Sequence, residues 1–172
     1  MMNRETFLTL WDNLRQRHGI TLRLIDALPA DRIDSNPIPN MRTPKQLLFH
    51  LYGQLVREVA KGVVSGEVLD TPDEAISALK TKDDLVRFVN QCWVDADRAA
   101  QSVTDAQLGR MMKTPWGSEM PGAMAWTVLN DEFLHHRGQL FAYVRALGHD
   151  VPMMWDFAHN APEYQPKAHA KG

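Results

Sequence analysis

The sequence predicts an all-α protein, a four-helix bundle with long crossover connections. Three observations support this prediction. Four long segments carry apolar residues every three or four positions, which is the spacing of one face of a helix. The segments between them are rich in proline and other turn-forming residues. No segment alternates apolar and polar residues convincingly at the period of a strand.

The first two long helices are bounded by local signals. The first is predicted from about Arg4 to Ala27, because the proline-rich segment after it cannot continue a helix. The second begins near Thr43, which can cap it, has Pro44 at its first helical position and ends near Gly66. The apolar face of the first helix is formed by Phe7, Trp11, Leu14, His18, Leu22 and Ile25. The core face of the second is formed by Leu47, Leu48, Leu51 and Leu55.

The connection to the third long helix contains a predicted short helix, "DTPDEAISAL". Thr71 and Glu74 have the spacing of a capping box at its start. The third long helix is then expected over residues 82–103. Its inward-facing stripe is predicted to be Leu85, Phe88, Cys92, Ala96 and Ala99.

The fourth long helix follows a segment of turn formers, "KTPWGSEMPGA", which predicts a loop. The helix is expected from about Ala123 to Leu147. Gly148 is a suitable residue to end it, and Pro152 lies just beyond. This completes the set of four helices that the bundle requires.

Length and composition restrict the class of protein. A chain of 172 residues suggests one domain, predicted over residues 1–160, with 161–172 as a flexible tail. The net charge of −2, with both signs interspersed, argues against nucleic-acid binding. A single cysteine excludes an internal disulfide. The charged N-terminus and the lack of an apolar run of ~20 residues predict a cytoplasmic protein that does not enter the membrane.

The fourth helix carries the candidate site. Its apolar stripe is formed by Ala125, Leu129, Phe133, His136, Leu140, Tyr143 and Leu147. His136 interrupts this stripe and is therefore expected to point into the bundle, with Glu132 one turn before it. Two polar groups on a core-facing stripe are best explained by a shared partner, and a divalent metal ion is one candidate. His50, at the edge of the second helix's stripe, is the predicted third ligand. Two histidines and one carboxylate leave coordination positions open, as catalytic metal sites do.

Simpler interpretations exist for each of these residues. A histidine at the edge of a stripe is more often a hydrogen-bonded core residue, and a Glu-x-x-x-His pair on a helix is a weak pattern alone. The neighbouring His135, about 100° round the helix, is expected at a flank or a subunit interface. Gly138 suggests close packing of another helix, and Gln139 is placed to hydrogen-bond near the site or across an interface.

Three further residues and segments attract functional hypotheses. Cys92 lies on an apolar stripe and is expected to be a buried structural cysteine instead of a nucleophile. His18 could support the metal site, but a hydrogen-bonded core histidine is the simpler interpretation. The loop at Trp116–Gly117 could cover the open side of the site or be an ordinary loop anchored by one aromatic ring.

The run "LHHRGQLFAYVRALGHDVP" resembles the last helix of the DinB-like superfamily of bacterial four-helix bundles, which includes the YfiT-type proteins. The segment "MRTPKQLLFHLYGQ" resembles the second helix of that family. The resemblance extends from about Phe7 to Trp155 and is strongest in its last 40 residues.

The resemblance implies a divalent metal held by three histidines, one from the second helix and two from the last. These positions fall on His50, Glu132 and His136, so this sequence has a glutamate where the family usually has histidine. Zinc or nickel is the expected metal, with iron or manganese as alternatives favoured by the harder carboxylate. The resemblance further implies a homodimer and a metal-dependent transferase or isomerase that uses a low-molecular-weight thiol such as bacillithiol, mycothiol or glutathione. The open metal position predicts a small-molecule substrate and adds hydrolysis as a candidate reaction.

Two other interpretations remain open at this point. One is a non-enzymatic helical dimer, a binding or stress-associated module whose metal site is vestigial. The other is a nonhaem iron oxygenase, which uses two histidines and one carboxylate but usually on a different fold. The sequence does not identify the substrate.

Overall fold

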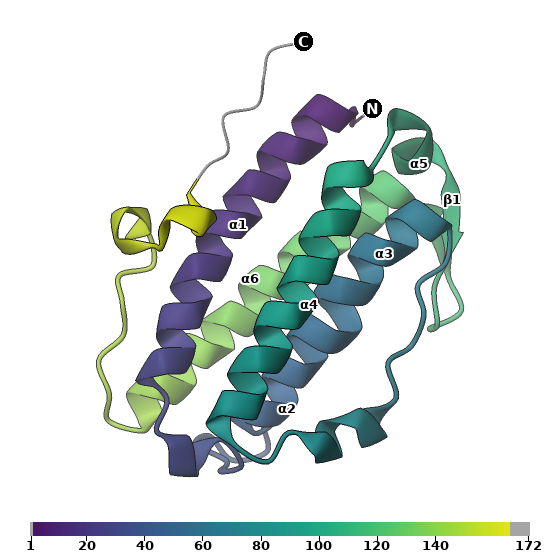
Figure 1. The fold of residues 1–172 in the computed structure, drawn as a ribbon. Coiled ribbons are helices and arrows are strands. Elements are labelled where there is room, and N and C mark those ends of the chain that lie inside the picture. The colour runs from purple at the N-terminus through teal and green to yellow at the C-terminus, as the bar shows by residue number, and fades with distance from the viewer. Residues whose placement is uncertain (1, 166–172) are drawn as a thin grey trace.

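The computed structural model describes residues 2–165 and contains a bundle of four long helices (Figure 1). The second of these runs without interruption from Pro44 to Ser65 and is divided into three named segments. The other three helices of the bundle are α1 (Arg4–Ala27), α4 (Lys82–Ser102) and α6 (Gly122–Ala146). The consecutive segments of the second helix are α2 (Pro44–Leu48), η2 (Phe49–Val56) and α3 (Arg57–Ser65). The short elements are η1 (Ala30–Arg32), η3 (Asp73–Ala78), α5 (Asp105–Gly109), β1 (Met111–Lys113), β2 (Glu119–Pro121), η4 (Phe157–His159) and η5 (Pro162–Tyr164).

The connection between α3 and α4 runs back along the length of the bundle, so these two helices point the same way (Figure 1). This is the crossover expected from the sequence. None of the helices within residues 2–165 combines the length and apolar character needed to cross a bilayer.

Local capping signals set the helix ends as predicted. The Thr43 hydroxyl accepts a hydrogen bond from the backbone N–H of Gln46, and the Gln46 side chain accepts one from the backbone N–H of Thr43, forming a capping box. Gly66 ends α3 with φ 97°, and Gly148 follows α6 with φ 81°. Both values lie in the left-handed region, which glycine enters without strain.

Aromatic rings fill the centre of the bundle. Trp11 of α1 stacks on Trp93 of α4 with ring centroids 5.3 Å apart, and it contacts Trp126 of α6 at 5.1 Å. Three helices are thus joined through one fully buried ring. Such pairs contribute roughly 0.5–1.5 kcal/mol beyond their burial.

Trp93 also explains why the residues that α4 buries differ from those predicted. Phe88 and Ala99, predicted to face inward, are only half-buried. Val89, Trp93 and Ala100 are buried instead, together with the predicted Leu85, Cys92 and Ala96. The helix is turned so that the large indole of Trp93 stacks against α1.

The middle of the second helix is a π-helix, which the sequence analysis did not predict. Over η2 the turns are wider, and the backbone N–H of Arg57 donates to the carbonyl of Tyr52, five residues back. Phe88 of α4 lies directly against Gly53, where a Cβ atom would be 2.7 Å from the ring. The glycine therefore allows α4 to pack closely on this segment. π-Helical turns are frequently found at functional sites, and His50 lies in this one.

The predicted loop before α6 is a short antiparallel hairpin of β1 and β2, with Met112 opposite Met120. Its strands are too short for alternation to be visible in the sequence. Tertiary contacts hold it, because the backbone N–H groups of Val68 and Lys113 each bond to a carbonyl on the other segment. Met112 is buried against Gly62 of α3.

The predicted capping box of Thr71 and Glu74 is wrong. The residues Asp73–Ala78 form a 3₁₀ helix without a side-chain cap. Thr71 is buried and points instead at the second helix, where its hydroxyl donates to the carbonyl of Gly53 at 3.0 Å. Docking of the crossover onto η2 therefore overrides the local capping preference.

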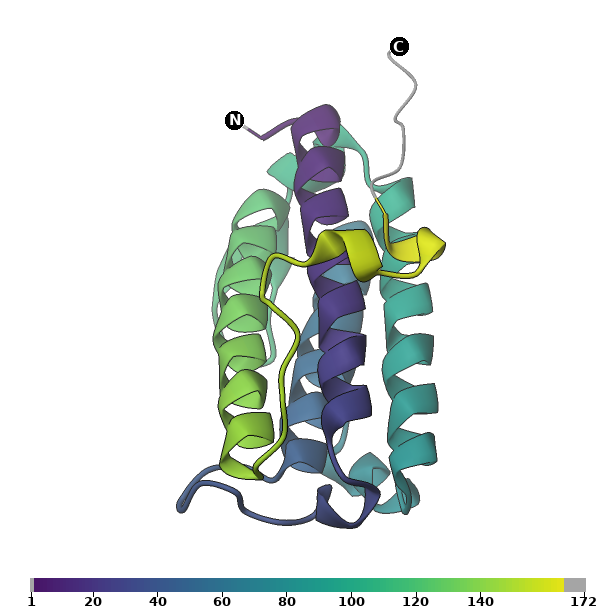
Figure 2. The same cartoon turned by 90° about the vertical axis from the view of Figure 1, so that its left-hand side faces the viewer.

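The C-terminal segment returns along the bundle from α6 and crosses α1 (Figure 2). Asn160 donates to the carbonyl of Gln16 at 2.8 Å and lies against Gly19, where no larger residue would fit. Arg23 donates to the backbone carbonyl of Asp156 at 2.8 Å. Of the predicted flexible tail, residues 166–172 lie outside the part of the chain that the structure describes.

Candidate metal centre

His50, Glu132 and His136 lie together between the second helix and α6. Each offers one ligand atom, and these three atoms all lie within 4.8 Å of one another. The two imidazole rings are nearly perpendicular, with centroids 5.0 Å apart. The π-helical segment presents His50, while the α-helical spacing of four residues places Glu132 and His136 on one face.

His136 is buried, with 4% of its surface exposed. Its Nε2 atom lies 3.2 Å from a Glu132 carboxylate oxygen but has no hydrogen-bond partner among the described residues. Burial lowers the pKa of His136, although the hydrogen bond to Gln139 and the Glu132 carboxylate oppose this shift. The imidazole is therefore neutral at pH 7, which is the form that binds a metal ion.

A glutamine supports each histidine from the side opposite the site. The Nδ1 atom of His136 is 2.8 Å from the Oε1 of Gln139, and the Nδ1 of His50 is 2.8 Å from the Oε1 of Gln54. In both cases the Nε2 atom is left for another ligand. Hydrogen bonds of this kind orient metal-binding histidines in proteins. The sequence analysis had placed Gln139 near the site but gave Gln54 no role, although its spacing of four from His50 was visible.

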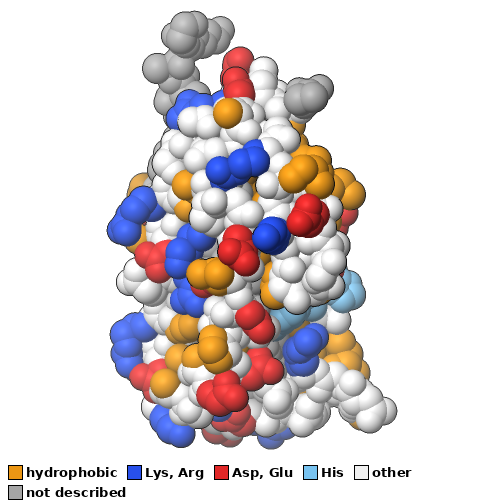
Figure 3. All heavy atoms as spheres, turned by 90° about the vertical axis from the view of Figure 1, so that its right-hand side faces the viewer, with side chains coloured by type: hydrophobic (Ala, Val, Ile, Leu, Met, Phe, Trp, Pro, Cys, Tyr) orange, Lys and Arg blue, Asp and Glu red, His pale blue; other side chains and the backbone are white. Residues whose placement is uncertain are grey.

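Glu132 forms the open side of the cluster, since its side chain is 42% exposed. On the face that carries η3 and the hairpin, histidine side chains reach the surface beside hydrophobic ones (Figure 3). The Glu132 carboxylate is therefore open to solvent, whereas His136 is buried.

The donor set fits a divalent metal ion. Two imidazoles and a carboxylate are ligands for zinc, nickel, iron or manganese. The buried Nε2 atom of His136 lacks a hydrogen-bond partner within residues 2–165, and such an orphaned atom requires an explanation. A metal ion shared with His50 and Glu132 supplies one.

The other residues considered from the sequence do not join this cluster. His135 is exposed, and its Nε2 atom contacts the amide of Gln139 at 3.1 Å. Trp116 is half-exposed and lines an apolar cavity of about 10 Å³ with Leu55 and Leu129, which is room for about one water molecule. Cys92 is fully buried, as expected, and burial raises the pKa of its thiol to about 12.

His18 is a core histidine. It is fully buried, its Nδ1 is 2.8 Å from the Tyr52 hydroxyl, and its ring stacks on Trp93 at 4.1 Å. Burial, reinforced by the nearby Arg15, lowers the pKa of His18 to about 3.

This burial predicts a loss of stability in mild acid. The unfolded chain protonates His18 near pH 6.5 and the folded chain only near 3, so the unfolded state binds more protons between these values. The contribution of neutral His18 to the free energy of unfolding is therefore fully present above about pH 6.5. Below that pH it falls by about 1.4 kcal/mol per pH unit. We expect His18→Gln to flatten the pH dependence of unfolding free energy between pH 7 and 5 in metal-free protein.

Urea denaturation at several pH values would measure this effect. His149→Gln is the matched control, because His149 is exposed and should leave the slope unchanged. An unaltered slope in the His18 variant would contradict the assignment of a neutral core imidazole.

Comparison with known proteins identifies the family. The sequence profile of the DinB family matches residues 1–167. The chain belongs to the DinB family. Among curated proteins the comparison finds no match.

Solved structures of other DinB proteins share the fold. A DinB-like protein from Bacillus subtilis is 20% identical, with a TM-score of 0.66 over 81% of this chain and 92% of that one. A DinB-like protein from Bacillus cereus is 24% identical, with a TM-score of 0.59 over 88% of this chain and 99% of that one. A DinB-family protein from Exiguobacterium sibiricum is 22% identical, with a TM-score of 0.55 over 86% and 97%.

Proposed function

We propose that this DinB-family protein binds a divalent metal ion through His50, Glu132 and His136 and acts on a small molecule at the open side of that site. The observation that carries the proposal is the buried, unpartnered Nε2 atom of His136, which lies within 4.8 Å of ligand atoms on both other residues. Zinc and nickel are the favoured ions because two of the three ligands are imidazoles. The carboxylate of Glu132 is a harder ligand than imidazole, so iron and manganese are the alternatives.

The ligand residues have distinct tasks. His50 and His136 present ring nitrogen atoms whose direction is set by the hydrogen bonds to Gln54 and Gln139. Glu132 adds a negative charge that offsets part of the charge of the ion and leaves solvent access on its side. A bound divalent ion would supply Lewis-acid chemistry, lowering the pKa of a water or thiol at an open position.

Two reaction classes use such a site. One is hydrolysis, and the other is transfer of a low-molecular-weight thiol of the bacillithiol, mycothiol or glutathione type. We propose these as the enzymatic activities to assay, on the basis of the open coordination side and the DinB resemblance.

Metal analysis of protein purified without added metal tests the proposal. We expect about one divalent ion per chain, retained through gel filtration and removed by a chelator. Metal-free protein that also fails to take up zinc, nickel, iron or manganese would overturn it. That outcome would favour a non-enzymatic helical module with a vestigial site.

We further propose that the protein is a homodimer. Gly138 lies mid-helix, yet apart from its two neighbours and the nearby backbone of its own helix no described atom comes within 4 Å of the position its Cβ would occupy. The close contact with another helix that Gly138 suggested is therefore not found within the described residues of one chain. A helix of a second copy would supply it. Sedimentation equilibrium should give twice the monomer mass of 19.6 kDa. A monomer at high micromolar concentration would contradict the proposal.

A further inference from the structure

Gln54 connects the candidate metal centre to the crossover between α3 and α4. We propose that Gln54 fixes His50 as the tautomer protonated on Nδ1, so that Nε2 is ready to bind metal before any ion arrives. Gln54 is thus a positioning residue, and the crossover is part of the metal site. The inference rests on the proposed metal centre for its function, but the tautomer itself is a property of the metal-free protein.

The orientation of the Gln54 amide follows from its partners. Its Nε2 donates to the backbone carbonyl of Thr71 at 3.1 Å and to a carboxylate oxygen of Asp73 at 2.8 Å. Both partners can only accept, so the NH₂ group must face them. The Oε1 atom is then the group that faces His50, at 2.8 Å from Nδ1. An amide oxygen accepts only, and His50 Nδ1 must therefore carry the proton.

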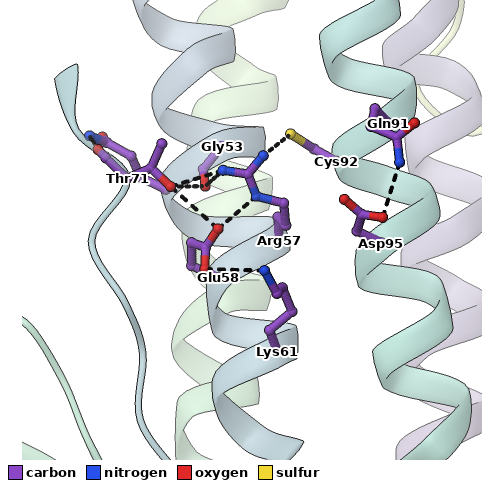
Figure 4. Close-up of polar contacts among 9 residues, drawn as sticks. Gly53, Arg57, Glu58, Lys61, Thr71, Gln91, Cys92 and Asp95 are labelled. Atoms are coloured by element: carbon purple, nitrogen blue, oxygen red, sulfur yellow. Dashed lines mark hydrogen bonds and ion pairs between the residues drawn. The ribbon is translucent and has the colours of Figure 1, made fainter. Parts of the chain in front are cut away.

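Of the two acceptors, Thr71 is held in place by the fold, whereas Asp73 is exposed. The hydroxyl of Thr71 donates to the carbonyl of Gly53 at 3.0 Å and receives a hydrogen bond from Arg57 at 2.9 Å. Arg57 is itself paired with Glu58 at 2.6 Å, and all four residues converge in Figure 4. Thr71 is buried. The crossover therefore cannot release Gln54 without breaking this network.

Gln139, which contacts His136 on α6, has no partner that fixes the orientation of its amide. The Nε2 atom of Gln139 meets His135 Nε2 at 3.1 Å, and that ring nitrogen can donate or accept. Either orientation of the Gln139 amide is thus satisfied, and either tautomer of His136 is compatible with it. Gln54 should matter more than Gln139 for metal affinity, although both touch a ligand at the same distance.

Nitrogen-15 NMR of histidines in the metal-free protein tests the tautomer directly. We expect a protonated Nδ1 and an unprotonated Nε2 for His50 in the parent. Gln54→Met removes the acceptor and should give a mixture of tautomers. Gln54→Glu keeps an acceptor toward His50 but loses both donors to the crossover, so it should keep the Nδ1-protonated form.

Calorimetric titration with zinc gives the second readout. We expect Gln54→Met to lose about 10- to 100-fold in affinity, which is the usual range for removing a residue that orients a ligand. Gln139→Met, the matched control, should lose less, and Gln54→Glu should retain more affinity than Gln54→Met. Parent protein with Nε2-protonated His50, or a Gln54→Met variant with unchanged spectrum and affinity, would overturn the inference. A parent that shows the expected tautomer but binds no metal would instead refute the proposed metal centre alone.

Discussion

Replacing His136 by alanine is expected to abolish zinc binding. The loss in affinity should exceed about 100-fold, the upper range for removing a residue that merely orients a ligand. His136 is buried mid-stripe and its unpartnered Nε2 faces Glu132, so no neighbouring side chain can take its place. His135 points to the exposed flank of the same helix. Without His136 only one ligand remains on each helix, too few for a stable site.

Titration of metal-stripped protein with zinc would measure this effect, with two variants as controls. His135→Ala removes an imidazole from the adjacent position and should bind zinc like the parent. Glu132→His restores three nitrogen ligands, so it should keep or tighten zinc binding. If His136→Ala bound zinc as tightly as the parent, we would abandon the assignment of the metal centre.

Replacing Asp97 by alanine should destabilise the bundle by about 3 kcal/mol or more. One carboxylate oxygen of Asp97 accepts from the Trp11 indole at 2.8 Å and from the Arg15 guanidinium at 2.7 Å. The Arg15 side chain is 2% exposed, contacts Asp12 at 3.2 Å and lies over the Trp93 ring at 6.0 Å. The variant therefore leaves a buried charge partly uncompensated and a buried indole N–H without its acceptor.

Urea denaturation at pH 7 would measure the change in unfolding free energy. Asp95→Ala on the same helix is the matched control, since the Asp95 side chain accepts a hydrogen bond from Gln91 at an exposed position. Its effect should stay within about 0.5 kcal/mol. A loss below about 1 kcal/mol in Asp97→Ala would show that Arg15 does not depend on this carboxylate.

The sequence predicted the long helices because their signals are local. Apolar spacing defined four segments, and capping by Thr43 and termination at Gly66 and Gly148 placed ends correctly to within a residue or two. The phase of the stripes on the second and fourth helices also selected His50, Glu132 and His136, which the structure brings together. Helical periodicity thus placed the three residues on the facing sides of two helices, although only His136 is buried and the Glu132 side chain is 42% exposed.

Features that depend on contacts between distant segments were missed or wrong. The hairpin β1–β2 is held by pairing with residues after α3, and Thr71 docks on η2 instead of capping a helix. The π-helical turns of η2 follow no sequence period. The hairpin and the docked Thr71 depend on hydrogen bonds between segments far apart in the chain, which no local pattern contains.

The features of the candidate site likewise fall into those that the sequence determined and those that depend on tertiary structure. The sequence alone determined the ligand types and their faces, because residue identity and helix phase are properties of a single segment. Only the tertiary structure decided that Asp73 and Thr71 orient Gln54, and through it His50. The crossover must first return along the bundle before these acceptors can reach the second helix. On our proposal, chain topology thus decides which nitrogen of His50 would be free for a metal ion.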